Sequence, residues 1–225
     1  MIYDRKVTAI VLIKAETEKP NGTLRLFNNK PLYRTLLDKL ENIFAIDEVL
    51  VDTDIKELQD ELPRFYKKAK YIQRFERLSK SDTNVNDIIA YDLTQTDNSE
   101  IFIQTHVNKP LLKKETIAKA LKKFVELEDH YDSLFSVNTY QSRFYDHAFK
   151  PINHDEDNLV RTRDLKPVYE ENSCFYIFTK ESYQQSKHRT GNNPYLFDIP
   201  SIEALELKDG LSYKLAEILM LYQEL

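Results

Sequence analysis

Three basic side chains follow the first apolar run of the chain at positions that suit phosphate binding. Lys14, Lys19 and Arg25 all come shortly after this run, and ammonium or guanidinium groups pair with phosphate oxygens. Glu16 and Glu18 lie in the same segment and would repel an anion, so an ordinary surface loop remains the alternative.

The chain has only three glycines, and none belongs to a phosphate-binding motif. Neither G-x-G-x-x-G nor the Walker A pattern occurs, although both serve to bring backbone N–H groups close to phosphates. The sequence therefore excludes an ordinary NAD-binding site and a P-loop nucleotidase.

A cluster of hydrogen-bonding side chains leaves another apolar run, Ile101–Thr105. Amide, hydroxyl and imidazole groups both donate and accept hydrogen bonds, which suits the recognition of a base or a sugar. We assign Gln104 and Thr105 to a nucleotide, and His106 and Asn108 to a second substrate. His106 is also a candidate base, although the sequence supplies no partner for it. A capped turn is the alternative.

Arginines supply the remaining candidates. Arg74 lies at the end of a third apolar run, which predicts a place in the same nucleotide pocket as Gln104. Arg161 and Arg163 precede Asn172, and we assign these three residues to substrate binding because arginine grips carboxylates and phosphates bidentately. The alternative for the two arginines is a surface ion-pair cluster.

The elements that must position these side chains alternate between strands and helices. Strands are expected at Val7–Ile13, Glu48–Thr53, 70–75, Ile101–Thr105, 134–137 and 174–178. Continuously apolar strands that alternate with helices predict an α/β fold, a mostly parallel Rossmann-like sheet with helices on both faces. Ligands bind at the carboxyl ends of the strands in such sheets, which is where the candidate residues lie.

Helical spacing of apolar residues fills the intervals between these strands. Helices are expected near residues 32–44, 55–62, 85–93, 117–125 and 213–225. Pro63 is expected to end the second helix, because proline has no N–H to donate. Asp82 and Thr83 offer the N-terminal cap of the third helix.

One long polar segment, residues 140–167, separates two expected strands. Loops of this length in compact domains are usually functional or disordered, and here a loop and a projecting arm are both open. Neither internal repeats nor a low-complexity linker occurs, so residues 1–225 are expected to form a single domain.

The composition of the chain limits which classes of partner it is expected to bind. The formal net charge of −5 gives no electrostatic basis for binding nucleic acid or an anionic membrane. The single cysteine, Cys174, excludes an internal disulfide and a cysteine-based zinc site, and its apolar surroundings predict a buried side chain. The sequence shows neither a signal-peptide pattern nor an apolar stretch of membrane-spanning length, so we expect a cytoplasmic chain.

Six motifs, in order along nearly the whole chain, resemble those of the N-acylneuraminate (sialic acid) cytidylyltransferases, the CMP-sugar synthetases. They are Lys30-Pro31-Leu32, Val51-Asp52-Thr53-Asp54, Arg74 before Ser81-Asp82-Thr83, Ile103-Gln104-Thr105-His106 before Pro110-Leu111-Leu112, Ser133-Leu134-Phe135-Ser136-Val137, and Tyr169-Glu170-Glu171-Asn172-Ser173-Cys174-Phe175-Tyr176. No single motif is specific, but six in sequence are.

The resemblance implies a nucleotide-diphospho-sugar transferase type of fold. It also implies a reaction in which the anomeric hydroxyl of a sialic-acid-like sugar acid attacks the α-phosphate of CTP, giving a CMP-sugar and pyrophosphate. Mg²⁺ would neutralise the phosphate oxygens, and Lys14 and Lys19 would act in catalysis by stabilising the charge that develops. Residues 140–167 would be a dimerisation arm of a homodimer, and Thr17 would occupy the place of the family's loop serine.

Several positions depart from the family pattern. Lys14 stands where the family has arginine, Gly22-Thr23 where it has lysine and asparagine, and Glu206 and Lys208 where it has two metal-binding aspartates. Glu206 is then the remaining candidate metal ligand. A lysine cannot ligate Mg²⁺ while charged, but Lys208 could replace the charge of the metal and so act in catalysis.

Two further interpretations stay open because of these departures. The chain could be a catalytically degenerate homologue that binds a nucleotide or a sugar, or acts as an assembly partner. It could also transfer a nucleotide with another base, or to another acceptor.

Overall fold

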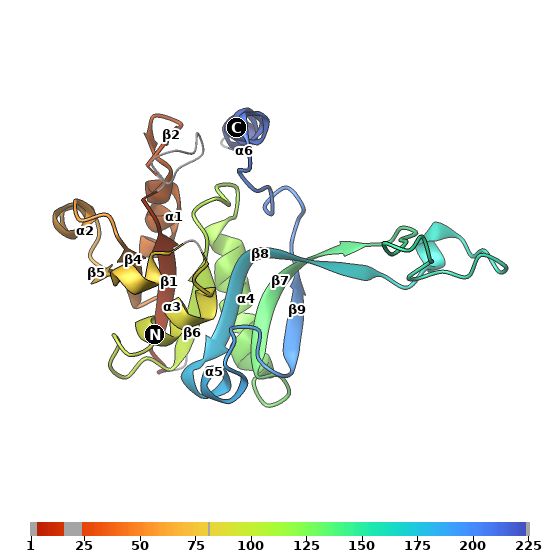
Figure 1. Cartoon of the computed structure of the whole chain (residues 1–225), viewed down its shortest axis with the longest axis horizontal. Coiled ribbons are helices and arrows are strands. Elements are labelled where there is room, and N and C mark those ends of the chain that lie inside the picture. The colour runs from red at the N-terminus through yellow and green to blue at the C-terminus, as the bar shows by residue number, and fades with distance from the viewer. Residues whose placement is uncertain (1–3, 16–23, 81, 224–225) are drawn as a thin grey trace.

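The computed structural model describes residues 4–15, 24–80 and 82–223. Its centre is a seven-stranded sheet with the strand order β5-β4-β1-β6-β8-β7-β9 (Figure 1). The strands are β1 (Val7–Ile13), β4 (Glu48–Thr53), β5 (Ala69–Gln73), β6 (Ile101–Thr105), β7 (Ser133–Tyr140), β8 (Val168–Thr179) and β9 (Pro194–Asp198). Only β8 runs antiparallel to its neighbours, so the predicted mostly parallel α/β sheet is confirmed.

Helices cover both faces of the sheet. The main apolar core packs β-strand side chains against α1 (Leu32–Glu41), α2 (Leu58–Phe65) and α4 (Lys114–Leu127). A second, smaller core on the other face includes residues of α3 (Val85–Asp92) and α5 (Lys180–Ser186). Burial on both faces explains why the central strands are continuously apolar in sequence.

The last helix, α6 (Gly210–Gln223), does not cover the sheet directly. It packs on a short hairpin formed by β2 (Leu26–Phe27) and β3 (Lys30–Pro31), and Phe27 and Tyr213 are buried between them. Asn28 and Asn29 form the two-residue turn of the hairpin with φ values of 47° and 65°. Asparagine tolerates this left-handed conformation better than most residues, which fits the turn.

Strands β7 and β8 continue beyond the sheet as a long projection (Figure 1). They stay paired out to Tyr140 and Val168, and a β-bridge between Tyr145 and Pro151 and a short 3₁₀ helix, η2 (Thr162–Asp164), lie further out. The polar segment 140–167 therefore forms an arm. The pairing of β7 with β8 shifts register between Phe135 and Val137, close to where β8 ends its pairing with β6.

The structure corrects two boundaries. Pro63 lies inside α2 and does not end it, because a proline near the end of a short helix removes only one hydrogen bond. The cap of α3 is Asn84, whose side chain accepts from the Asn86 backbone N–H, and not Asp82 or Thr83. The β2–β3 hairpin, α5 and β9 have weak apolar patterns and were not expected.

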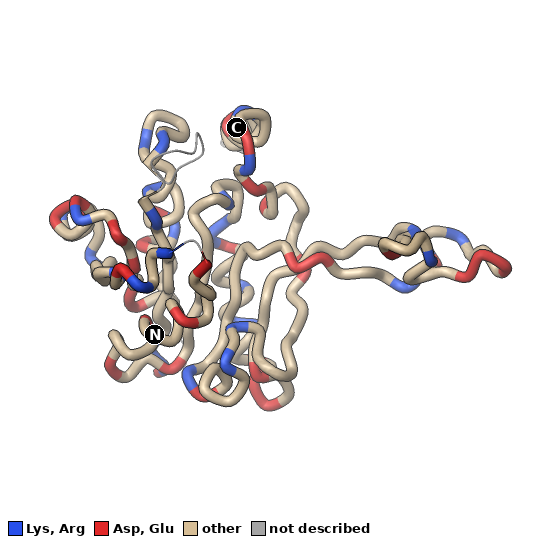
Figure 2. The backbone as a smooth tube through the Cα atoms, in the orientation of Figure 1, with Lys and Arg blue, Asp and Glu red and all other residues tan. Residues whose placement is uncertain are grey.

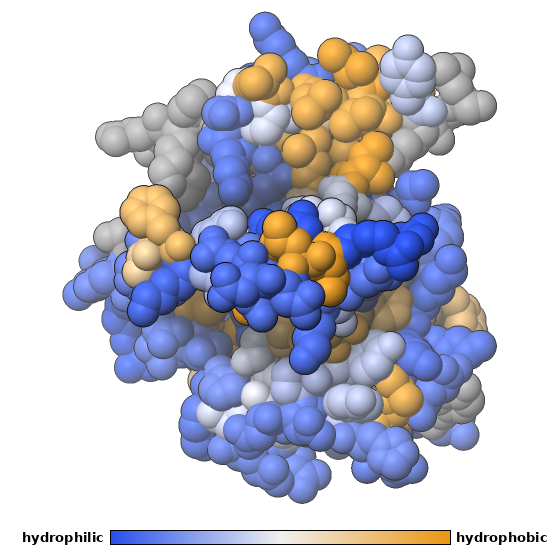
Figure 3. Space-filling model, turned by 90° about the vertical axis from the view of Figure 1, so that its right-hand side faces the viewer, coloured by the Kyte–Doolittle hydropathy of each residue, from blue (hydrophilic) through white to orange (hydrophobic). Residues whose placement is uncertain are grey.

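The two signs of charge are interspersed over the fold (Figure 2). Among the helices of the described segments, none is both long enough and apolar enough to span a bilayer. Apolar side chains do gather on one exposed surface, the outer side of α6, where Leu211, Leu215 and Ile218 are 76%, 44% and 53% exposed (top of Figure 3).

Candidate functional site

The carboxyl ends of the parallel strands meet at one edge, which we call the strand-end edge. Lys14 is the first residue after β1 and therefore lies at this edge. Next to it, the Ala15 backbone N–H donates to Asp54 Oδ1 at 2.8 Å, which ties the segments after β1 and β4 together. Thr17 and Lys19, the other residues predicted in this loop, lie outside the described residues.

Arg74 is buried at the same edge and is held by an acidic partner. Its guanidinium donates to the Asp52 carboxylate through Nε, and to the Asp52 backbone oxygen through Nη2 at 3.0 Å. The two side chains are 3% and 0% exposed. In this arrangement Arg74 supports the ends of β4 and β5, and its role as a nucleotide ligand stays a prediction.

A second carboxyl group, Asp92 of α3, adjoins this ion pair. Burial is the main cause that raises the pKa of Asp92, to about 9, and the charge of Asp52 adds to it. Burial likewise raises the pKa of Asp52, against the opposing effect of Arg74. Two ionised carboxylates would have no donor between them, so a proton shared by Asp92 and Asp52 satisfies oxygens that otherwise lack a partner.

Gln104 and His106 extend from β6 into a polar network with an arginine that the sequence did not single out. Arg189 Nη1 donates to Gln104 Oε1 at 2.6 Å, and Gln104 Nε2 lies 3.1 Å from His106 Nε2. The Arg189 guanidinium also stacks on the Tyr176 ring, with 3.7 Å from its carbon to the ring centroid. Among the described residues, no carboxylate lies within ion-pair distance of Arg189.

This network decides the state of His106. Burial lowers the pKa of His106 to about 4, and the nearby positive charges of Arg189 and Lys109 lower it further. The ring is therefore neutral near pH 7, and Nε2 accepts from the surrounding donors. A group with this pKa binds a proton weakly, so His106 is better placed to recognise a ligand than to act as a general base.

Thr105 and Asn172 have structural partners. Thr105 Oγ1 donates to the Cys174 backbone oxygen at 2.8 Å, which joins β6 to β8. Asn172 Oδ1 accepts from Ser136 Oγ at 2.6 Å and from the Cys174 backbone N–H at 3.2 Å. Both residues lie near the strand-end edge, but these contacts engage their side chains within the fold.

Three donors surround the Glu206 carboxylate. Lys109 Nζ and Lys208 Nζ lie 3.2 Å and 3.6 Å from Glu206 Oε2, and Asn108 Nδ2 donates to Glu206 Oε1 at 3.3 Å. Burial alone would raise the pKa of Glu206, but the two lysines outweigh it and lower the pKa. Glu206 therefore stays ionised with its charge already balanced.

This donor set does not fit a divalent metal ion. Mg²⁺ requires oxygen ligands, whereas Glu206 faces two ammonium groups whose charge opposes a cation. Across residues 4–15, 24–80 and 82–223, His, Cys, Asp and Glu side chains do not gather in any group of three that could hold a metal. The Glu206 position predicted as a metal ligand thus carries a carboxylate–lysine cluster.

A polar cavity of about 470 Å³ adjoins this cluster. Its lining includes Lys109, Glu206 and Lys208 on one side, and Glu171 and Asn172 of β8 on the other. Glu171 accepts from the Tyr176 hydroxyl, which connects the cavity to the ring that Arg189 covers. A volume in this range holds a small polar metabolite.

The remaining predicted residues lie elsewhere. The Arg25 guanidinium packs over the Tyr213 ring of α6, 4.0 Å from its centroid, and so contacts the C-terminal helix. Arg161 and Arg163 lie in the arm, where Arg161 pairs with Asp164 at 2.7 Å (Figure 1). Within one chain the arm holds these two arginines away from the strand-end edge, so their role in substrate binding stays a prediction.

Comparison with known proteins places the chain in a family. The profile of the Cytidylyltransferase family matches residues 19–224. The chain therefore belongs to the cytidylyltransferase family. It is 23% identical over 194 residues to the N-acylneuraminate cytidylyltransferase of Streptococcus agalactiae serotype V (strain ATCC BAA-611 / 2603 V/R). That match covers 84% of this chain but only 46% of the relative, so the chain spans about half of the relative's length.

Solved structures share the fold at low identity. A CMP:2-keto-3-deoxy-manno-octonic acid synthetase, solved in complex with CTP, aligns with a TM-score of 0.69 and 12% identity, covering 98% of this chain and 100% of that one. The 4-diphosphocytidyl-2C-methyl-D-erythritol synthase of Anaerococcus prevotii DSM 20548 aligns with a TM-score of 0.67 and 13% identity, covering 96% and 99%. The nucleotidyltransferase type of fold implied by the motifs is confirmed.

Sequence reasoning missed three residues that shape the site: Arg189, Lys109 and Asp92. Lys109 could have been found, since it lies beside Asn108 in the polar cluster after β6. Asp92 occupies an apolar helix stripe, where a charged residue is unusual. Arg189 follows a short helix that the apolar pattern does not show, and nothing in the sequence indicates that its side chain reaches Gln104.

Proposed function

We propose that this chain transfers a cytidylyl group from CTP to a sialic-acid-like sugar acid, with release of pyrophosphate. The anomeric oxygen of the acceptor would form a bond to the α-phosphorus while the bond to the bridging oxygen of the β-phosphate breaks. Pyrophosphate would carry away the electron pair, and the hydroxyl proton would pass to solvent. The family assignment and the CTP named for a structural neighbour support the nucleotide; the relative's name supports the acceptor.

One observation carries the proposal most directly: the polar cavity beside Glu206 opens where two lysines gather at the carboxyl ends of the strands. The ammonium groups of Lys109 and Lys208 both contact Glu206, whereas Glu170, Glu171 and Asp209 add negative charge elsewhere in the lining. The two ammonium groups would bind the phosphates of CTP locally and stabilise the negative charge that develops on them.

Arg189 supports an acceptor that bears a carboxylate. Its guanidinium contacts Gln104 and Tyr176, both neutral, and has no acidic ion-pair partner among the described residues. His106 beside it offers a hydrogen-bonding nitrogen for hydroxyls of the acceptor, and Gln104 is assigned to the nucleotide. A carboxylate is the natural partner for a partly buried guanidinium in these surroundings.

No step in this proposal passes through Mg²⁺ at Glu206, because the residues there do not fit a divalent cation. Lys208 instead carries positive charge at that place. Any Mg²⁺ requirement would then come with the nucleotide or from residues other than Glu206.

The experiment is to measure pyrophosphate release with each of the four ribonucleoside triphosphates and a panel of sugar acids. The proposal expects pyrophosphate release with CTP and a nonulosonic acid. It expects none with a neutral sugar that keeps the anomeric hydroxyl but lacks the carboxylate. Release with another triphosphate, or with acceptors that lack a carboxylate, would contradict it.

A second candidate function rests on the same carboxylate–lysine cluster. Because Glu206 is already balanced by Lys109 and Lys208, the chain could bind the nucleotide or the sugar without turning it over. The same assay separates the candidates when calorimetry accompanies it. Binding of CTP or CMP without pyrophosphate release favours the non-catalytic homologue.

We also propose that the arm mediates a homodimer. Its outer part exposes Phe149, Ile152 and Leu159 at 87%, 57% and 65%, which is unusual for apolar side chains on a free projection. Dimerisation would cover them and would bring Arg161 and Arg163 toward the partner subunit. Sedimentation that shows only monomers at micromolar concentration would contradict this proposal, and so would a Phe149→Ser/Leu159→Ser variant that dimerises like the unmodified chain.

A further inference from the structure

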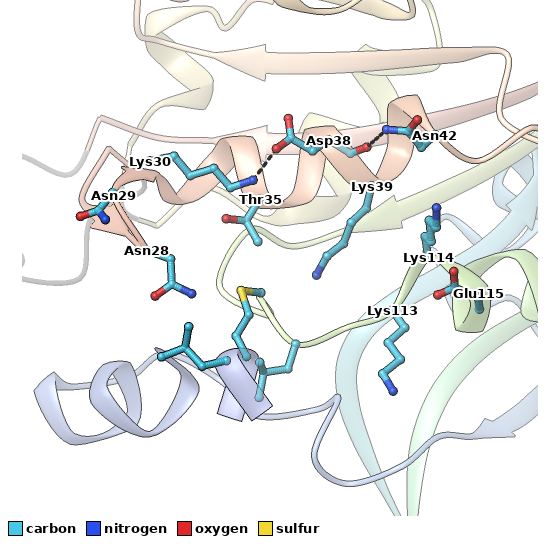
Figure 4. A pocket seen from close by; sticks show the side chains of 13 residues that line it. Asn28, Asn29, Lys30, Thr35, Asp38, Lys39, Asn42, Lys113, Lys114 and Glu115 are labelled. Atoms are coloured by element: carbon cyan, nitrogen blue, oxygen red, sulfur yellow. Dashed lines mark hydrogen bonds and ion pairs between the residues drawn. The ribbon is translucent and has the colours of Figure 1, made fainter. Parts of the chain in front are cut away.

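A large cavity lies away from the strand-end edge, between α1, the start of α4 and the end of α6 (Figure 4). It has a volume of about 1100 Å³, and the β2–β3 turn closes one side. Its lining shares no residue with the 470 Å³ cavity beside Glu206. The proposed cytidylyl transfer therefore does not use it.

The charge of this cavity is positive although the chain as a whole is negative. Four lysines line it, Lys30, Lys39, Lys113 and Lys114, against two acidic residues, Asp38 and Glu115. Asp38 is already paired with Lys30, at 2.5 Å between Oδ2 and Nζ. The lining thus has a net charge of +2 from these six groups, and the printed sequence has −5 overall.

Lys39 is held at the inner wall of the cavity. Its ammonium donates to the backbone oxygens of Pro110 and Leu112, with 2.7 Å to the latter. Burial lowers the pKa of Lys39 to about 8, and the charge of Lys30 contributes. An anion bound here would reverse the unfavourable surroundings of this ammonium.

A buried hydroxyl in the wall has no partner. Thr35 is 3% exposed and lines the cavity, and its Oγ1 makes no hydrogen bond. Figure 4 shows Thr35 and Lys39 projecting from α1 on the same side. Buried hydroxyls are nearly always hydrogen-bonded, so a lone one in a cavity wall indicates a missing acceptor.

The start of α4 adds donors from a second direction. The backbone N–H of its N-cap residue, Lys113, donates to the Glu203 carboxylate at 3.0 Å, whereas the Lys113 side chain makes no cap hydrogen bond. The first backbone N–H groups of a helix have no partner within it and carry a partial positive charge. Lys113, Lys114 and Glu115 of this turn line the cavity, where Glu115 is the one carboxylate that remains unpaired with a lysine in the lining.

We propose that this cavity is a second binding site, for a small molecule that carries a phosphate group. The phosphate would lie between Lys39, Lys113 and Lys114, and would accept a hydrogen bond from Thr35. Lysine ammonium groups, hydroxyls and the backbone N–H groups of the first helical turn are donors that proteins use for phosphate. The apolar side chains of Leu111, Met220 and Leu221 would contact the remainder of the ligand.

The test is an amide NMR titration of the full chain with inorganic phosphate, with sodium chloride added to hold the ionic strength constant. Saturable shifts are expected at Thr35, Lys39 and residues 113–115. Lys113→Glu/Lys114→Glu should weaken the apparent affinity by at least about tenfold, since each lost charged hydrogen bond has a large effect. Glutamate is well tolerated at a helix start, so this variant should fold.

The matched control is Lys122→Glu/Lys123→Glu, which makes the same charge change on the same helix outside the cavity. It should leave the affinity within about twofold, as expected for distant screened charges. Thr35→Val should weaken phosphate binding and raise or preserve the melting temperature, because it removes an unpaired hydroxyl from the free protein.

Three results would overturn the proposal. They are equal weakening by both double variants, shifts confined to the strand-end edge, or unchanged phosphate affinity in Thr35→Val. None of these results depends on whether the chain transfers a cytidylyl group, because the readout is binding at this cavity and not turnover.

Discussion

Carboxyl groups and cations meet at two places near the strand ends, in opposite proportions. Asp52 and Asp92 share one cation, Arg74, and this cluster is buried. Glu206 instead has two cations, Lys109 and Lys208, and is 34% exposed. The first cluster therefore has an excess of acid and the second an excess of base.

The difference in proportion determines which protonation state each cluster keeps. Two buried carboxyls with one guanidinium cannot both stay ionised, so Asp92 has a raised pKa and retains a proton. One carboxylate with two ammonium groups keeps a lowered pKa and stays ionised. The first cluster stabilises the fold, whereas the second presents charge to a cavity, and four measurements test this contrast.

The largest expected effect is at the buried cluster. Arg74→Met should destabilise the chain by about 3–5 kcal/mol, because it leaves buried carboxyls without their cation. Urea denaturation measures this loss. Arg77→Met, at an exposed position three residues further on, should cost less than about 0.5 kcal/mol. Adding Asp52→Asn to Arg74→Met should restore part of the lost stability. A double variant no more stable than Arg74→Met alone would argue against the Arg74–Asp52 ion pair.

The two lysines on Glu206 should differ from each other. Lys109 is 5% exposed and also donates to the Ala204 backbone oxygen, so Lys109→Met should cost about 1–3 kcal/mol. The Lys208 side chain is 71% exposed, and Lys208→Met should cost under about 1 kcal/mol. Thermal unfolding compares them, and equal losses would contradict the geometry.

The buried carboxyl pair predicts a pH dependence of stability. The pKa of Asp92 is about 9 in the folded chain and ordinary when unfolded, so between these values the folded state binds more protons. The free energy of unfolding should therefore fall as pH rises from about 5 to 9, with a contribution on the order of 1 kcal/mol per pH unit. Asp92→Asn should flatten this slope. If the slope persists in Asp92→Asn, the pH dependence comes from other titratable groups.

The last of the four predictions concerns nucleotide recognition by Gln104. Gln104→Ala should weaken CTP binding by about 1–3 kcal/mol if its amide contacts the nucleotide, since a partner is left unpaired. Calorimetry measures this. Gln185→Ala, on the exposed side of α5, is the control and should leave the affinity unchanged. Equal affinity in both variants would move the nucleotide away from Gln104.

Most of the fold could be predicted because it depends on apolar periodicity. Glu48–Thr53 and Ile101–Thr105 are strands that each contain a run of buried apolar residues, and both were predicted with their observed bounds. The β9 strand is only partly buried, and α5 is a polar helix of seven residues, so neither has a periodic apolar pattern. Pro63 shows the limit of a local rule, since tertiary packing keeps α2 intact around it.

The candidate site could be predicted less completely, because contacts between distant residues decide it. The cluster at Gln104 and His106 was found from sequence, yet the partner that fixes their state, Arg189, lies 85 positions from Gln104. The family resemblance directed attention to Glu206 and Lys208. It could not show that Lys109 is the second lysine that pairs with Glu206.

The central claim is that Lys208, and not a divalent cation, supplies positive charge beside Glu206. Calorimetric titration of CTP into the unmodified chain and into Lys208→Asp, each with excess EDTA and then with Mg²⁺, tests it most directly. The account predicts that the unmodified chain binds CTP in EDTA, and that Lys208→Asp loses this binding until Mg²⁺ is added. The account would be contradicted if the unmodified chain bound CTP only when Mg²⁺ is present and Lys208→Asp showed the same Mg²⁺ dependence.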